Sequence, residues 1–249
     1  RTSKGLPVIN LLNLDQEEKV MSIINVDEYN DNEYLFFITK QGLVKRTDIK
    51  EFESIRQNGK IAILLRDGDE LFDVKHTDGN CIIGIASSKG KLCSFDENDV
   101  RSMGRTASGV KGMNVDGSVV VGATTSKEGN LILVLSEHGY GKLSDSSDYR
   151  LTARGTKGVI TLNTTEKVGN LVCMRAVRGD EDVMIITSNG IVIRTFLGDV
   201  KVAGRNTQGV RIIRLDEGAS ISSIAVLEHQ EPDEGAENEE SSEENVVEE

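Results

Sequence analysis

Short glycine-containing loops rich in Arg and Lys recur along this sequence of 249 residues. The clearest copy is "RSMGRTASGVKGMNV" at residues 101–115, which carries Arg101, Arg105 and Lys111 and no Asp or Glu. Cationic side chains beside glycines, which let backbone N–H groups approach closely, are typical of sites that bind phosphate oxygens. The loop therefore predicts contact with a polyanion through its phosphates.

Related windows occur at residues 1–12, 54–66, 150–163 and 201–214. The five windows hold 15 basic residues and no acid, although the formal net charge of the chain is −12. Their central glycines stand 49–54 residues apart and are Gly5, Gly59, Gly109, Gly158 and Gly209. An Arg stands four residues before four of these glycines, and the Gly59 copy has Ile55 there, followed by Arg56. In a radial repeat, equivalent loops take equivalent places, so the windows predict a basic belt. A second interpretation is that these arginines and glycines only build turns.

The elements that position the windows are short strands around a second series of glycines. "LFFITKQGLVKRT", "GIASSKGKLCSF", "LVLSEHGYGKLS" and "MIITSNGIVIRT" place turn glycines at Gly42, Gly90, Gly139 and Gly190 between β-rich runs. Asn189-Gly190 favours a type I′ hairpin turn. Strands are also predicted directly after each window glycine, including "KIAILL" at 60–65, and after a polar turn, including "KVMSIINV" at 19–26. Four strands in about fifty residues is the size of a propeller blade. No sustained 3.6-residue apolar period occurs, so we expect an all-β fold.

The sequence lacks the motifs of nucleotide-binding, metal-binding and catalytic sites. "SSKGKL" and "HGYGKL" resemble phosphate loops, but Leu92 and Leu143 stand where a P-loop needs Ser or Thr. His76, His138 and His229 have no metal-ligand spacing, and no Ser, His and Asp arrangement emerges. Cys81, Cys93 and Cys173 form no CxxC pair and are expected to be free thiols in a reducing cytoplasm. We expect no catalytic residue, metal site or membrane span in this chain.

The carboxyl-terminal residues 228–249 contain 11 acidic residues and no Lys or Arg. The remaining residues 1–227 hold 30 acids and 29 bases. The low apolar content predicts a disordered acidic tail after a β domain at 1–227. The tail either competes with a polyanion for the basic belt or only adds solubility.

Five stretches carry a resemblance to a known family: "SKGLPVINLL", "GRNTQGVRIIRL", "RGTKGVITL", "EHGYGKLS" and the acidic end. They look like the carboxy-terminal domain of the bacterial DNA gyrase A subunit, and the likeness covers residues 1 to about 227 in order. The resemblance implies a six-bladed β-pinwheel, a propeller-like disk of four-stranded blades that exchange strands. Its first blade is only partly present here, from Arg1, which leaves about five blades.

The resemblance also implies a function. It implies that DNA wraps around the basic belt, so that a type II topoisomerase introduces negative supercoils by ATP-dependent strand passage. The implied partners are duplex DNA, the amino-terminal domain of the same polypeptide and the gyrase B subunit in an A2B2 complex, in the cytoplasm. No cofactor is expected in this chain, because the resemblance implies that ATP and Mg act elsewhere in the holoenzyme and that the catalytic tyrosine lies upstream. The family's Gln-Arg-Arg-Gly-Gly-Lys-Gly box is not in this sequence.

The candidate DNA contacts lie in the windows and the hairpins. Those in the windows are Arg1, Lys4, Arg56, Lys60, Arg101, Arg105, Lys111, Arg150, Arg154, Lys157, Arg205 and Arg211. Those in the hairpins are Lys45, Arg46, Lys91, Lys142 and Arg194. Two alternatives stay open: a subunit of topoisomerase IV, whose repeats are usually less regular, and a propeller-like scaffold that binds a protein partner through acidic edges.

Overall fold

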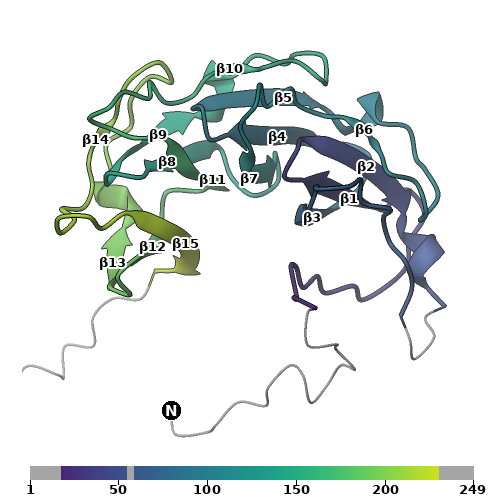
Figure 1. Cartoon of the computed structure of the whole chain (residues 1–249). Coiled ribbons are helices and arrows are strands. Elements are labelled where there is room, and N and C mark those ends of the chain that lie inside the picture. Colours follow the sequence, from purple (N-terminus) through teal and green to yellow (C-terminus); the bar gives the residue numbers. More distant parts are fainter. Residues whose placement is uncertain (1–17, 55–58, 230–249) are drawn as a thin grey trace, which may run out of the picture.

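Short strands and glycine turns build a curved row of small sheets (Figure 1). The structure is a computed structural model that describes residues 18–54 and 59–229. The strands of the described residues form three sheets, the largest of which contains two hairpins. Each blade is built around one hairpin, and we name each blade after its turn glycine. The Gly42 blade has β1 (Tyr34–Thr39) and β2 (Leu43–Asp48), and the Gly90 blade has β4 (Ile82–Ser87) and β5 (Lys91–Asp96). The Gly139 blade has β8 (Leu131–Ser136) and β9 (Tyr140–Asp145), and the Gly190 blade has β12 (Glu181–Thr187) and β13 (Val192–Phe196).

One further strand covers each hairpin on the concave side of the arc (Figure 1). These strands are β3 (Leu71–Thr77) on β1, β7 (Val120–Thr125) on β4, β11 (Leu171–Val177) on β8 and β15 (Ile221–Glu228) on β12, all antiparallel. A single parallel pairing, Met174 with Gly122, joins the Gly90 and Gly139 sheets. The blades therefore stack side by side into one continuous arc.

The outermost strands are two residues long and come from the windows. They are β6 (Val110–Lys111) on β2, β10 (Val159–Ile160) on β5 and β14 (Val210–Arg211) on β9. Each of these strands follows one hairpin in the sequence but pairs with the hairpin before it. Neighbouring blades therefore exchange strands, which is the arrangement predicted for a pinwheel.

The all-β prediction is confirmed. Within the described residues the helical segments are only the short 3-10 turns η2 (Ile49–Phe52), η3 (Glu97–Asp99), η4 (Ser146–Asp148) and η5 (Leu197–Asp199). Three of them begin after an Asp whose carboxylate accepts a backbone N–H, namely Asp48, Asp96 and Asp145. The described residues supply four of the blades of the expected six-bladed pinwheel.

The hydrophobic core lies between successive blades. Phe36 of β1 and Phe95 of β5 are fully buried with ring centroids 6.4 Å apart, in a cluster shared by the Gly42 and Gly90 blades. A second cluster, including Leu92 and Val134, joins the Gly90 and Gly139 blades, and a third joins the Gly139 and Gly190 blades. Each blade thus buries its apolar face only against its neighbours, which fixes the order of the windows along the outer edge.

Three of the window glycines, Gly109, Gly158 and Gly209, pack directly on the preceding hairpin. At Gly158, which has a φ of +75°, an added Cβ would lie 2.3 Å from the carbonyl oxygen of Leu92. Gly109 and Gly209 make equally close approaches to Val44 and Gly141, whereas Gly59 has nothing within 4 Å. At Gly109, Gly158 and Gly209 a glycine is required because the returning strand passes too close to the hairpin backbone for a side chain.

The hairpin turns differ from one prediction. Gly190 has a φ of +85°, but Asn189 does not have a positive φ, so the predicted type I′ turn is wrong. The Gly190 N–H donates to the carbonyl of Thr187 at 3.0 Å instead. This is the pattern of a type I turn followed by a left-handed glycine, which also matches the right-handed twist of the strands.

Two predicted strands do not form. Residues 59–70 and 18–29 contain no strand, although the sequence suggested strands at 60–65 and 19–26. In the repeat, both segments would pair with a hairpin that precedes Gly42 by one unit, and the described residues contain none. Their backbone groups therefore have no sheet to join. The window at 1–12 and the tail after residue 229 lie outside the described residues, and β15 extends one residue past the predicted boundary, to Glu228.

Candidate nucleic-acid interface

Three of the windows, at 101–115, 150–163 and 201–214, lie along the convex edge of the arc. β6, β10 and β14 are the outermost strands of their sheets, and the residues before them run beside the hairpins (Figure 1). Isolated parallel bridges, Arg46 with Ser102 and Leu143 with Val202, fix this path in two blades. The acid-free segments are thereby gathered on a single outer surface, which we call the rim: residues 101–115, 150–163 and 201–214.

One row of rim arginines bridges successive windows. Arg105 donates from Nη1 to the carbonyl of Ile61 at 3.2 Å. Arg154 donates to Lys111 O at 3.1 Å, and Arg205 donates to Ile160 O at 3.1 Å. Each acceptor lies two residues after the glycine of the window before. We call Arg105, Arg154 and Arg205 the bridging row, because the same bond recurs at every step of the rim.

The bridging row keeps part of its donor capacity. Arg154 also donates from Nε to Asp99 O at 3.0 Å, and Arg105 Nε lies 3.6 Å from the Glu51 carboxylate. A guanidinium has five N–H donors, so these contacts use only some of them. These arginines therefore build the rim and still present positive charge on it.

A second row stands four residues earlier in each window. Arg101, Arg150 and Lys201 are exposed, and none has a side-chain hydrogen bond or ion pair within the described residues. We call these three residues the unpaired row. The sequence predicted Arg101 and Arg150 as DNA contacts but not Lys201, although its place eight residues before Gly209 repeats theirs. Side chains with no protein partner are the ones most available to a ligand.

The other basic residues of the rim differ in whether their side chains have a protein partner. Lys111 is exposed and its ammonium has no partner within the described residues. Lys157 pairs with Asp116 at 2.9 Å, and this contact lowers the pKa of the Asp116 carboxyl. Arg211 donates to the hydroxyl of Tyr140 at 2.9 Å and lies over its ring, and this bond lowers the pKa of Tyr140.

Two predicted hairpin contacts lie inside the protein. Lys45 and Lys142 are both 0% exposed. Lys45 Nζ donates to the carbonyls of Ala62 and Arg105, the latter at 2.6 Å, and Lys142 Nζ donates to Gly204 O at 2.5 Å. Burial lowers the pKa of each lysine to about 8. This differs from the expected solvent-facing role, because both side chains point beneath the rim.

The remaining basic residues of the hairpins contact other protein groups or are partly buried. Arg46 is 7% exposed, stacks over the Tyr34 ring at 4.4 Å and donates to Asn98 at 2.7 Å. Arg194 donates from Nε to Asp182 at 2.8 Å, and Lys91 is half-buried. In the window 54–66, Lys60 donates to Glu51 O at 2.9 Å. Arg1, Lys4 and Arg56 lie outside the described residues.

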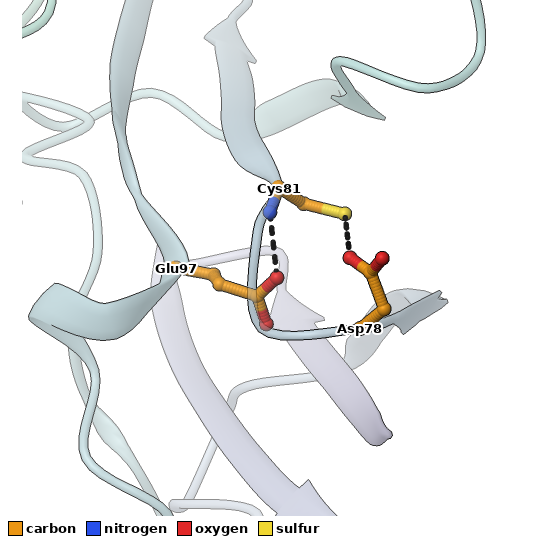
Figure 2. A group of neighbouring side chains, drawn as sticks. All are labelled: Asp78, Cys81 and Glu97. Carbon is orange, nitrogen blue, oxygen red and sulfur yellow. Dashed lines mark hydrogen bonds between the residues drawn. The ribbon is translucent and has the colours of Figure 1, made fainter. Parts of the chain in front are cut away.

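Asp78, Cys81 and Glu97 form the one cluster of three potential metal ligands found in the part of the chain that the structure describes (Figure 2). Glu97 accepts the Cys81 N–H at 2.8 Å and the Thr77 hydroxyl at 2.6 Å, while the Cys81 thiol donates to Asp78 at 3.5 Å. Burial raises the pKa of Cys81 to about 11, and the Lys127 ammonium lowers the pKa of Asp78 to about 2. A neutral thiol is a poor ligand, and the carboxylates already serve protein donors. The cluster fits a structural joint between β4 and η3 rather than a metal centre.

Glu97 also connects two blades. Its carboxylate is fully buried and lies 3.6 Å from the guanidinium of Arg46 in the neighbouring Gly42 blade. The histidines have ordinary polar contacts, such as His138 with Lys167 O at 3.1 Å. Within residues 18–54 and 59–229, no helix has the length and apolarity needed to cross a membrane.

Comparison with known families agrees with the repeat. The family model described as "DNA gyrase C-terminal domain, beta-propeller" matches residues 1–27, 33–78, 85–127, 130–177 and 181–228. The matched segments follow the repeat inferred from the two glycine series.

Curated relatives cover nearly the whole chain. The DNA gyrase A subunit of Ureaplasma parvum serovar 3 is 47% identical over 232 residues, which are 93% of this chain and 28% of that protein. The DNA gyrase A subunit of Staphylococcus aureus (strain NCTC 8325 / PS 47) is 42% identical over 245 residues, 97% of this chain and 28% of that protein. The chain thus spans about 28% of the length of these relatives.

Solved structures share the architecture. A DNA gyrase A C-terminal domain superposes with a TM-score of 0.78 and 28% identity, covering 90% of this chain and 76% of that one. A C-terminal domain of DNA topoisomerase IV superposes with a TM-score of 0.83 at 24% identity, covering 90% and 71%. The second likeness concerns the fold alone, whereas the first also extends to sequence.

Proposed function

This chain belongs to the DNA gyrase C-terminal domain family, and from that premise we propose that it binds duplex DNA along its convex rim and bends it. The observation that carries the proposal is the unpaired row, Arg101, Arg150 and Lys201, at one position of three successive windows. Each of these cations would meet the phosphate backbone at a regular interval. Such contacts are independent of base sequence and release counterions.

The curvature of the rim supports bending rather than straight binding. Bending a site of 20–30 bp costs roughly 1–6 kcal/mol, and added phosphate contacts around the arc offset that cost. The rim windows carry no acid, so DNA that follows the arc meets no carboxylate of the windows themselves. A duplex that stayed straight would reach only part of the row.

In the complete enzyme the domain would act as the DNA-wrapping module of a type II topoisomerase. Its partners there would be the amino-terminal domain of the same polypeptide and the gyrase B subunit, in the A2B2 complex of the cytoplasm. ATP and Mg would be used by those other parts. The relatives' name, which is that of the DNA gyrase A subunit, supports this assignment over topoisomerase IV.

The test is to ligate nicked circular DNA with the protein bound and to measure the linking number that is trapped. The parent chain should shift the linking number at low salt, and the triple variant Arg101→Ala/Arg150→Ala/Lys201→Ala should lose most of the shift. The matched control is Lys40→Ala/Lys50→Ala/Lys127→Ala, which removes the same charge from lysines paired with Glu70, Asp31 and Asp78 outside the rim. A parent that never shifts the linking number, and instead retains a protein partner regardless of salt, would support the scaffold alternative.

A further inference from the structure

In three of the four described blades, the residue three positions after the turn glycine lies beneath the rim. In the described blades this residue is Lys45, Cys93, Lys142 or Ile193. The first three are fully buried. Each of these three belongs to the hairpin strand over which a later window passes, so it lies between its own blade and a rim loop.

Lys45 joins two windows at once. Its ammonium donates to Arg105 O at 2.6 Å in the window 101–115 and to Ala62 O in the window before it. It also lies 5.1 Å from the centre of the Phe37 ring. The side chain of Arg105 reaches Ile61 O, so the same two windows are joined twice, once from above and once from below.

Lys142 makes a similar contact two blades later, to a carbonyl one residue earlier in the repeat. Its ammonium donates to Gly204 O at 2.5 Å, in the window 201–214. Gly204 directly precedes Arg205 of the bridging row and lies three residues after Lys201 of the unpaired row. The buried ammonium therefore holds the backbone between the two rows.

Cys93 places a polar side chain at the same point of the Gly90 blade. Its thiol lies 3.9 Å from Ala153 O and 3.9 Å from Gly112 O, in two successive windows. Ala153 occupies the repeat position of Gly204, and Gly112 that of Ala62. Ile193 has no polar group, and no later window passes over its hairpin within the described residues.

We propose that Lys45 and Lys142 are positioning residues of the rim: the buried ammonium of Lys45 joins two successive windows, and that of Lys142 holds the window 201–214 on its hairpin, each in the register that meets DNA. This inference rests on the proposed function of the rim. A charge-assisted hydrogen bond is stronger and shorter than a neutral one, so an ammonium restrains a loop carbonyl more tightly than a thiol does.

The ionisation of these lysines agrees with that geometry. Burial lowers the pKa of both to about 8. For Lys45, the Arg105 charge lowers the pKa further and Glu51 opposes the change. For Lys142, Asp148 raises the pKa and Arg205 lowers it. At neutral pH both side chains remain largely protonated, and above pH 9 they become neutral amines that still donate a hydrogen bond.

The experiment uses Lys142→Met, with Ile193→Met as the matched control at the same repeat position. We expect Lys142→Met to fold, with backbone hydrogen exchange in residues 201–209 faster by about tenfold, the equivalent of one charge-assisted bond. Its affinity for duplex DNA should fall by a similar factor, and Ile193→Met should change neither quantity. If Lys142→Met does not fold, Lys142→Cys takes its place with the same readouts, because it installs the side chain that the Gly90 blade already holds there.

Repeating the DNA titrations at pH 9.5 separates position from charge. Since the neutral amine still donates to Gly204 O, although through a weaker bond, the affinity ratio between parent and variant should shrink at that pH without disappearing. A ratio that vanishes at pH 9.5 means that Lys142 acts only as a charge, and unchanged exchange in residues 201–209 means that it positions nothing; either result overturns the proposal. If the parent protein binds no DNA at all, the proposed function is wrong. The hydrogen-exchange data would still test whether Lys142 restrains the window 201–214.

Discussion

The rim carries two rows of basic residues with the same period and different partners. In the bridging row, every arginine donates to a carbonyl of the window before it. In the unpaired row, four residues earlier, no side chain has a partner within the described residues. The comparison shows that a repeated charge marks a surface but does not assign a role. An arginine that reaches a backbone carbonyl helps to hold the fold together. An arginine or lysine without such a partner remains available to solvent and to ligands.

The largest effect expected from this difference is on the salt dependence of DNA binding. Each phosphate contact contributes about −0.9 to the slope of log K against log salt concentration. The triple alanine variant of the unpaired row should therefore flatten the slope by about 2.7, and the same change in the bridging row should flatten it by about 1. Filter binding or fluorescence anisotropy across a salt series gives both slopes. Equal slopes for the two variants would remove the functional distinction between the rows.

Stability should respond in the opposite order. Alanine at Arg105, Arg154 and Arg205 removes three inter-window hydrogen bonds of about 1 kcal/mol each, so the free energy of unfolding should fall by about 3 kcal/mol. Alanine at the unpaired row should change it by less than about 0.5 kcal/mol per residue. Urea unfolding of the two triple variants measures this directly. A bridging-row variant as stable as the parent would show that the carbonyl contacts contribute nothing measurable.

A single glycine should disturb both rows of one window. Gly158→Ala places a Cβ against Leu92 O at a positive φ, so we expect a loss of about 2 kcal/mol and displacement of both Arg150 and Arg154. Gly59→Ala carries the backbone strain without the clash and should lose only about 1 kcal/mol. Thermal unfolding of the pair separates the two costs. Equal losses would mean that the close approach of the returning strand is not what requires a glycine.

The smallest effect concerns the buried lysines, which are paired with carbonyls but belong to neither row. Their pKa is about 8 in the folded protein, below the ordinary value of 10.5. Between these values the unfolded chain binds more protons, so the free energy of unfolding should rise with pH. The rise is about 0.7 kcal/mol per lysine over one pH unit centred on pH 8. Urea unfolding from pH 7.5 to 8.5 should show this slope in the parent and not in Lys45→Met/Lys142→Met; a slope that survives in the variant must come from other groups.

Much of the architecture was predictable from the sequence. Two glycine series with a spacing near fifty residues predicted the blades, and the acid-free windows predicted one basic surface. The repeat did not indicate which strands pair with each other. Nothing in "VKGMNV" indicates that Val110 pairs with the Gly42 hairpin and not with the Gly90 hairpin that precedes it in the sequence. Strand partners depend on which edge is open in three dimensions, and a period in the sequence carries no such information.

The same limit explains the errors among the site residues. Lys45 and Lys142 follow turn glycines, where a lysine is usually exposed to solvent. They are buried because a later window packs over the hairpin strand that carries them. Lys201 was missed because its neighbour Arg205 repeats a clearer motif. The type I′ turn at Asn189 failed because the glycine alone takes up the positive φ.

The return of each rim strand to the blade before it has a consequence during synthesis. The Gly42 hairpin receives its outer strand only after Lys111 has left the ribosome, with the whole Gly90 hairpin made in between. A nascent chain therefore always displays one unfinished sheet edge, and that edge moves toward the carboxyl terminus as translation proceeds. Exposed edges invite pairing with other chains, and contacts between distant residues form slowly. The exchanged strands hold the finished arc together. For the same reason, we expect misassembly to be most frequent when translation pauses between two hairpins.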